Sequence, residues 1–193
     1  MNLDWALFQA LNSLAGRWSA FDRAIQFLMN DYALTTALST LVVALWFRGR
    51  TPEEREADQL AAVYTIIALL AASAIVKLLN LTFVRPRPFT DHDGVHLLFY
   101  HPSDSSLPSN SATVAFCFAT GVFQRSRGLG WAGVAMGVIL GLSRVIGGVH
   151  YPLDIVAGAL IAIGTVWIVQ RHSRFLAPLA RGIRALARLL LLA

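Results

Sequence analysis

Four long apolar runs constrain this chain more than any other feature of its sequence. They cover residues 32–47, 60–76, 129–145 and 153–169, and a shorter run covers residues 112–123. Each long run approaches the roughly 20 residues that a helix needs to cross about 30 Å of hydrocarbon. None alternates with the period of a barrel strand, and backbone groups in lipid need internal partners. We therefore expect an all-α integral membrane bundle of about five transmembrane helices.

Composition supports this class and argues against two others. Charged residues make up 14% of the chain, hydrophobic residues 56%, and the mean hydropathy is +0.58. Soluble domains contain about 25% charged residues, so a soluble enzyme is disfavoured, and disordered chains are polar and poor in aromatic residues. The single cysteine, Cys117, forms no internal disulfide and cannot by itself build a thiolate metal site. The length of 193 residues predicts one domain, residues 1–193.

The segments outside the apolar runs are predicted to lie at the membrane surface. In residues 3–14, leucine and alanine recur at helical spacing with polar residues between them. This pattern predicts an interfacial helix within an N-terminal segment, residues 1–30, whose residues 21–29 lead into the first span. Residues 171–193 alternate arginines with apolar residues and are predicted to form a basic cytoplasmic tail. Orientation and solubility are the simplest role for this tail.

Positive charge predicts how the spans are oriented. One set of span ends and loops holds ten arginines, whereas the other set holds five arginines and Lys77. The side richer in arginine is expected to be cytoplasmic, which places the loop 81–111 and the turn at His150 outside. We therefore expect a multi-pass protein of the inner, cytoplasmic membrane. The net charge of +5 does not predict nucleic-acid binding, because the basic residues flank apolar runs.

The strongest chemical motif is Ser143-Arg144, five residues, His150, three residues and Asp154. The glycine pair at 147–148 predicts a tight turn that carries His150, with Asp154 one helical turn below it. A carboxylate there can hold one imidazole nitrogen and leave the other free as a nucleophile. Arg144 would bind anionic oxygens. The structural alternative is a turn histidine capped by an acid, with an arginine that reaches lipid headgroups.

A second motif precedes the short apolar run. Ser109 is placed to cap this helix, and the backbone N–H groups of Asn110, Ser111 and Ala112 would then form an anion site. A plain helix cap without a ligand is the alternative.

The third motif is the Arg-Pro-Arg-Pro sequence of residues 85–88, which follows Lys77 and Asn80. Proline stops a helix and holds the chain extended, so only one of Arg85 and Arg87 is expected to point into the site. Arginines that converge on a helix N-terminus suit a phosphoryl group. Contact with the membrane interface is the alternative role for either arginine.

Together, the three motifs resemble those of the type 2 phosphatidic acid phosphatase superfamily, the lipid phosphate phosphatases. The motif Ser-Arg-x5-His-x3-Asp is complete. The motif Lys-x6-Arg-Pro is irregular, because Lys77 is one residue too far from Arg85 and Asn80 stands where Arg87 would need its lysine. The motif Pro-Ser-x-His has Ser111 in place of histidine.

The resemblance implies that His150 attacks phosphorus to give a phosphohistidine and that Asp154 orients the ring. It implies that the phosphoryl oxygens are held without a metal or other cofactor. The expected phosphate-binding residues are Arg144, Arg85, Arg87, Lys77, Ser143, Ser109, Asn110 and Ser111.

The missing histidine bears on the substrate. By the resemblance, it would protonate the leaving oxygen or handle the hydrolytic water, and a leaving phosphate needs little protonation. A diphosphate is therefore the expected substrate, and the chain is similar to bacterial undecaprenyl-pyrophosphate phosphatases. A phosphatidate or phosphatidylglycerophosphate phosphatase remains open, as does a non-catalytic lipid-phosphate binder or transport accessory. His92, His96 or His101 is an alternative source of the acid. The sequence leaves the lipid chain length and the oligomeric state open.

Overall fold

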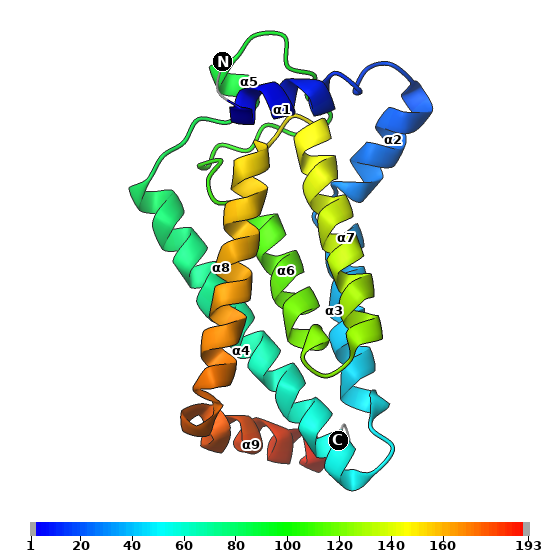
Figure 1. The fold of residues 1–193 in the computed structure, drawn as a ribbon, viewed down its shortest axis with the longest axis vertical. Helices are drawn as coiled ribbons and strands as arrows, with labels where there is room; N and C mark the ends of the chain where they lie inside the picture. Colours follow the sequence, from blue (N-terminus) through cyan, green and yellow to red (C-terminus); the bar gives the residue numbers. More distant parts are fainter. Residues whose placement is uncertain (1–2, 191–193) are drawn as a thin grey trace.

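The computed structural model describes residues 3–190, which fold into an all-helical bundle (Figure 1). Within these residues there is no β-strand. Residues 1, 2 and 191–193, which belong to the predicted N-terminal segment and basic tail, lie outside the described residues. The helices are α1 (Leu3–Asn12), α2 (Ser19–Leu28), α3 (Ala33–Arg48), α4 (Pro52–Thr82), α5 (Pro88–Asp91), α6 (Asn110–Phe123), α7 (Arg127–Ile146), α8 (Pro152–Arg171) and α9 (Ser173–Leu189).

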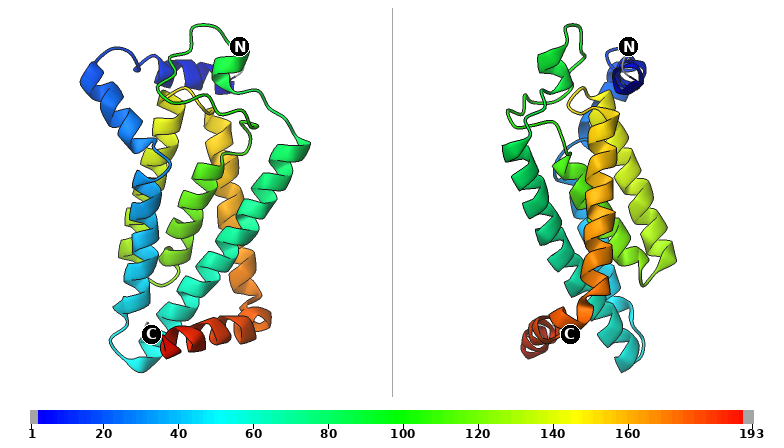
Figure 2. Two further views of the ribbon diagram at one scale, coloured as in Figure 1. Left: turned by 180° about the vertical axis from the view of Figure 1, so that it is seen from behind. Right: turned by 60° about the vertical axis from the view of Figure 1, so that its left-hand side comes forward.

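The short helix α6 is the centre of the bundle. It packs against α3, α4, α7 and α8, and Figures 1 and 2 show it between these longer helices. Ala115 and Ala119 on α6 have no exposed surface, and a Cβ on Gly121 would lie 2.2 Å from the hydroxyl of Thr65 on α4. Small residues therefore let the neighbouring helices approach α6 closely, as is common where helices pack in membranes.

The two ends of the bundle differ in structure and charge. At the site end, α1 lies across the helix ends beneath the long connection from α4 to α6, and the α7–α8 turn reaches it from below (Figure 1). At the opposite, basic end, α9 lies across the bundle (Figures 1 and 2). The ten arginines of the predicted cytoplasmic side all belong to helix ends, turns and α9 at the basic end.

The helices agree with the predicted runs in position and differ from them in length. Helices α4, α7 and α8 are each long and apolar enough to cross a membrane. Helix α4 has 31 residues and begins eight residues before the predicted run, because its first turns carry acids that a hydropathy pattern omits. Residues 19–28 form a separate helix, α2, bent by 44° from α3, and the two together make a fourth candidate span. Helix α6 has only 14 residues, so the count of five spans stays a prediction.

Helix α1 buries polar side chains. Asp4, Phe8 and Asn12 face the bundle, whereas Leu3 and Leu7 are exposed. The amide of Asn12 donates to the carbonyl oxygens of His96 and Ile146, each at 2.8 Å. Leu3 and Leu7 of the predicted interfacial helix therefore face outward, whereas Leu11 packs against the core, and polar contacts together with buried Phe8 attach α1 to the protein.

A buried carboxylate joins three segments at the basic end. Asp58 on α4 has no exposed surface and pairs with Arg48 of α3 at 2.9 Å and with Arg125 of the α6–α7 turn at 2.8 Å. Removing one partner of a fully buried pair costs about 3–5 kcal/mol. The cost here is smaller, because both arginines are partly exposed and can be solvated.

We predict that Asp58→Ala lowers the free energy of unfolding in detergent by about 2 kcal/mol, because two partly buried guanidinium groups lose their carboxylate. Thermal unfolding followed by intrinsic fluorescence measures the change. The exposed Glu53→Gln serves as the control and should leave the unfolding midpoint nearly unchanged. Equal midpoints for the two variants would show that the Asp58 pairs do not stabilise this end.

Candidate functional site

A polar cavity of about 240 Å³ opens at the site end. It lies between the C-terminal end of α4, the N-terminal end of α6, the α2–α3 turn, the α4–α6 connection and the α7–α8 turn. Ten of its lining residues are polar: Asp31, Asn80, Arg87, Tyr100, Asp104, Ser105, Asn110, Ser111, Arg144 and His150. Three predicted motifs therefore contribute to one cavity.

The α7–α8 turn fixes the position of His150. Gly148 has φ +85°, and a Cβ there would lie 2.6 Å from the backbone oxygen of His96, so glycine suits this turn. The His150 ring is buried, and its Nδ1 lies 3.0 Å from the carbonyl oxygen of Ser106. A carbonyl oxygen only accepts, so Nδ1 carries the hydrogen. Nε2 faces the cavity, 3.5 Å from Nη1 of Arg87. Nε2 is therefore the nitrogen available for chemistry.

Asp154 lies behind the imidazole and has no exposed surface. Its Oδ2 lies 3.5 Å from Nδ1 of His150, and it accepts hydrogen bonds from the Ser106 hydroxyl and from the backbone N–H of Tyr151 at 2.8 Å. Its Oδ1 pairs with Nη1 of Arg85 at 2.6 Å. The carboxylate is thus held by three groups besides the histidine.

The surroundings keep His150 neutral. Burial lowers the pKa of His150 below its ordinary value of 6.5. The hydrogen bond with Asp154 opposes this effect, and the positive charges of Arg87 and Arg144 lower the pKa further. A neutral imidazole with its Nδ1 hydrogen held and its Nε2 free is the form that attacks an electrophile.

Two buried arginines line the cavity, and each is paired with a more exposed acid. Nη2 of Arg87 lies 2.7 Å from Oδ1 of Asp104, and Nη2 of Arg144 pairs with Asp31. The arginine side chains are 7% and 4% exposed, whereas those of Asp104 and Asp31 are 62% and 42% exposed. The guanidinium groups are therefore fixed in the wall, and the acids lie at the solvent side. An anion in the cavity can replace the carboxylates at the same donors.

The N-terminus of α6 forms another part of the wall. Ser109 caps the helix as predicted, because its hydroxyl accepts from the N–H of Ala112 at 3.4 Å. Asn110 and Ser111 line the cavity, where the positive end of the helix dipole favours an anion. Ser109 itself is fully buried and supports this wall without lining it.

Three other predicted phosphate-binding residues also lie outside the cavity. Arg85 points away from it toward Asp154, so Arg87 is the one arginine of residues 85–88 that reaches the cavity. Lys77 is exposed on α4, one helical turn before Asn80, which does line the cavity. The Ser143 hydroxyl is buried and donates to the carbonyl oxygen of Leu140 at 2.8 Å. A sequence motif gives only the order of the residues. The side of the helix or loop on which each residue lies decides whether its side chain points into the cavity.

Several residues at the site were not predicted. Asp31 and Asp104 pair with the arginines, Tyr100 and Ser105 line the wall, and Ser106 contacts both His150 and Asp154. All five lie in turns or in the connection before α6, where no periodic pattern marks them. Among residues 3–190, no three His, Cys, Asp or Glu side chains are grouped to hold a metal ion.

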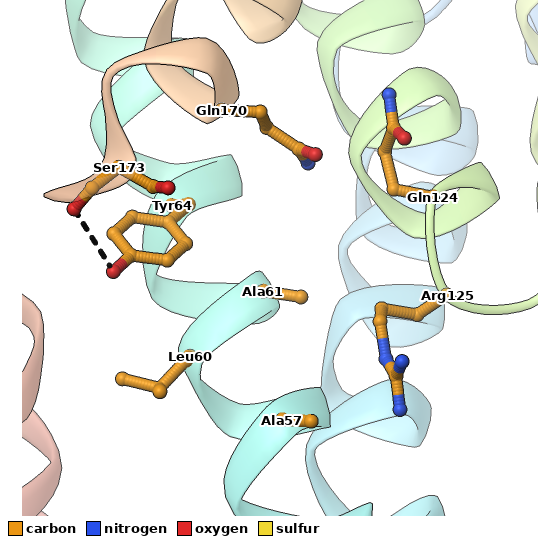
Figure 3. Close-up of a pocket in the computed structure, with 8 residues that line it drawn as sticks. All are labelled: Ala57, Leu60, Ala61, Tyr64, Gln124, Arg125, Gln170 and Ser173. Carbon is orange, nitrogen blue, oxygen red and sulfur yellow. Dashed lines mark hydrogen bonds between the residues drawn. The ribbon is translucent and has the colours of Figure 1, made fainter. Parts of the chain in front are cut away.

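A cavity at the basic end has a different character (Figure 3). It measures about 280 Å³ and lies between α4, the α6–α7 turn and the α8–α9 junction. Tyr64 donates there to the backbone oxygen of Ser173 at 3.4 Å, and Arg125 is already paired with Asp58. Its lining residues include no histidine, serine–histidine pair or carboxylate. The chemistry therefore belongs to the site end.

We predict that Arg87→Gln weakens binding of inorganic phosphate at least tenfold, because it removes a charged donor from the cavity wall. Arg85→Gln should change the affinity less than about threefold, since that side chain points away from the cavity. Isothermal titration in detergent at constant ionic strength measures both. Equal losses in the two variants would contradict the assignment of Arg87 as the arginine that faces the anion.

The chain is similar in sequence to a known family and to characterised proteins. The family model described as "PAP2 superfamily" matches residues 61–176, more than half of the chain. Undecaprenyl-diphosphatase BcrC of Bacillus subtilis is 31% identical over 176 residues, which cover 91% of this chain and 87% of that protein. The matched segment holds His150, Asp154 and both cavity arginines, whereas α1 lies before it.

Two crystal structures share the fold. LpxE of Aquifex aeolicus superposes with a TM-score of 0.67 at 26% identity and covers 89% of this chain and 96% of its own. A transmembrane PAP2-type phosphatidylglycerolphosphate phosphatase from Bacillus subtilis gives a TM-score of 0.62 at 18% identity, with 90% and 88% covered. These matches confirm the all-helical membrane architecture. This chain belongs to the PAP2 superfamily, and it is a membrane phosphatase related to the undecaprenyl-diphosphatases.

Proposed function

We propose that the protein removes the terminal phosphate of a polyprenyl diphosphate, such as undecaprenyl diphosphate, through a phosphohistidine on His150. The observation that carries this proposal is the orientation of one buried imidazole. Its Nδ1 is held by the Ser106 carbonyl and Asp154, while its Nε2 faces the cavity beside Arg87.

In the first step, Nε2 of His150 attacks the terminal phosphorus and forms a P–N bond. The bond from phosphorus to the bridging oxygen breaks, and its electron pair leaves with the lipid monophosphate. Arg87, Arg144 and the α6 N-terminus bind the phosphoryl oxygens as charge moves onto them. The ring now carries positive charge with its Nδ1 hydrogen in place, and the buried carboxylate of Asp154 stabilises that charge.

In the second step, water attacks the phosphohistidine and the P–N bond breaks. Its electron pair returns to Nε2 and restores the neutral ring, while inorganic phosphate takes the oxygen of the water. The released proton goes to phosphate or to solvent, because the cavity opens at the surface and its acids are partly exposed.

The substrate class follows from the leaving group. Ser111 stands in the cavity wall where the resembled motif has its histidine, so that position supplies no imidazole acid. A lipid monophosphate leaves without protonation far more readily than an alkoxide does, and a general acid is worth about 10² to 10⁴ in rate. A diphosphate therefore suits this site better than phosphatidate or phosphatidylglycerophosphate. The similarity to a protein named undecaprenyl-diphosphatase supports the same class.

We also propose that the protein crosses the cytoplasmic membrane several times with its site end outside. The distribution of arginine supports this orientation, since ten of them gather at the basic end. A lipid in the outer leaflet would then present its phosphates to the cavity.

We expect the purified protein to release phosphate from undecaprenyl diphosphate in detergent with EDTA, and faster than from phosphatidate or phosphatidylglycerophosphate. His150→Ala should lose at least about 10³-fold in kcat, because no other group in the wall forms the intermediate. Brief reaction with a ³²P-labelled terminal phosphate should give acid-labile, base-stable label on the wild type. Binding without release from any of the three lipids would overturn the enzyme and favour a lipid-phosphate binder.

We predict that Ser111→His raises turnover of phosphatidate at least about tenfold and turnover of the diphosphate much less. The new imidazole could protonate an alkoxide leaving group, whereas the leaving phosphate gains little from it. Parallel kcat measurements on the two lipids give the ratio, with Ser111→Asn as the control for side-chain size. Equal gains on both substrates would refute the leaving-group argument.

A further inference from the structure

The first turn of α1 places a buried acid behind the catalytic groups. Asp4 is 3% exposed, and its Oδ1 accepts from the backbone N–H of Leu153 at 2.9 Å, in the first turn of α8. Its Oδ2 pairs with Nη2 of Arg85 at 2.7 Å. Asp4 thus contacts the helix that carries Asp154 and the arginine that binds Asp154, although it lies outside the segment matched by the family model.

Arg85 connects the two carboxylates. One of its terminal nitrogens binds Asp4 and the other binds Asp154 at 2.6 Å, and its Cζ lies 4.1 Å from the centre of the Tyr151 ring. Burial alone would lower the pKa of Arg85, but the bonds and charges of Asp4 and Asp154 outweigh it and raise that pKa. The guanidinium therefore stays charged and shared between two acids. The chain of contacts runs from Asp4 through Arg85 and Asp154 to His150.

The sharing decides how strongly Asp154 acts on the imidazole. An arginine paired with Asp154 alone would neutralise that carboxylate and weaken it as a partner for Nδ1 of His150. Arg85 pairs with Asp4 through one terminal nitrogen and with Asp154 through the other. Two carboxylates and one guanidinium leave a net negative charge behind the His150 ring. This charge opposes Arg87 and Arg144, which face His150 from the cavity side.

We infer that Asp4 is a positioning residue for the phosphatase reaction, one that preserves the negative charge of Asp154 by sharing Arg85. The inference rests on the proposed role of His150 as the nucleophile. It gives α1 a part in catalysis: the helix brings a carboxylate to the rear of the site.

A purely structural role for Asp4 makes a different prediction. As an acceptor for the Leu153 N–H, Asp4 also attaches α1 to α8, and its loss could simply loosen the helix. Asn12, at the other end of α1, offers a matched comparison because it attaches the same helix through neutral hydrogen bonds. Asp22 offers a second comparison, since it is an acid of α2 whose Oδ1 accepts from the backbone of Gly16.

The test is Asp4→Asn, which keeps an oxygen for Leu153 and removes the charge. Nuclear magnetic resonance of histidine-labelled protein in detergent, with the His150 signal assigned by its loss in His150→Asn, measures the pKa of that ring without any substrate. We expect Asp4→Asn to lower the pKa of His150 by roughly half a pH unit or more, since one negative charge near it is lost. Asn12→Ala and Asp22→Asn should leave it unchanged.

Activity and a double variant complete the test. The acidic limb of the kcat/KM profile on undecaprenyl diphosphate should move to lower pH by the same amount, and kcat should fall about threefold or more, with KM nearly constant. Adding Arg85→Gln to Asp4→Asn should return the pKa of His150 toward its wild-type value, because the unbalanced positive charge is removed.

The outcomes separate the two proposals. An unchanged pKa of His150 in Asp4→Asn, or an equal shift in Asn12→Ala, would overturn the positioning role even if the wild type is fully active. A shifted pKa in a protein that hydrolyses none of the lipids would support the charge sharing and overturn the proposed function.

Discussion

A fully buried carboxylate, Asp154, sets the main constraint on the site end of this bundle. A buried charge must be paired and hydrogen-bonded, because an unpaired one lowers the free energy of unfolding by several kcal/mol. Asp154 has three partners besides His150: Tyr151 at the start of its own helix, and Arg85 and Ser106 of the α4–α6 connection. The contacts of Arg85 and Ser106 with Asp154 therefore hold the α4–α6 connection against α8. The same contacts hold the imidazole of His150 with its Nε2 toward the cavity.

The charges in the cavity wall are arranged in the opposite way to those around Asp154: here the cations are buried and the anions are exposed. Arg87 and Arg144 are held inside the wall, while Asp104 and Asp31 that neutralise them reach solvent. The exposed acids are solvated when they leave the pair, so displacing them costs less than displacing the buried arginines would. An anion that replaced the acids would exchange one set of charge-assisted bonds for another, and the arginines are already in place for it. The arrangement of the arginines in the wall thus already suits an anion.

The sequence predicted the positions of the apolar helices and the placement of Asp154 beside His150, and it predicted the remaining contacts only in part. Apolar runs locate helices because lipid imposes them, and the spacing from Ser143 to Asp154 crosses one tight turn whose geometry is local. The choice between Arg85 and Arg87 needed the path of the α4–α6 connection, although the spacing of six residues between Asn80 and Arg87 matches that of the family motif. Asp31 and Asp104 lie in turns without a pattern. Asp4 looked like one polar residue of a surface helix, since a helical period does not reveal which side is buried.

The two buried acids Asp58 and Asp154 lie at opposite ends of the bundle, and they differ in how their oxygens are paired. Asp58 binds arginines through both of its oxygens, so positive charge faces the whole carboxylate. Asp154 binds Arg85 through Oδ1 only, and its Oδ2 meets a hydroxyl, a backbone N–H and the imidazole. Because those donors are neutral, much of the negative charge at Oδ2 remains available to the ring of His150. The same kind of residue thus stabilises the bundle at one end and, at the other, keeps negative charge beside the imidazole of His150.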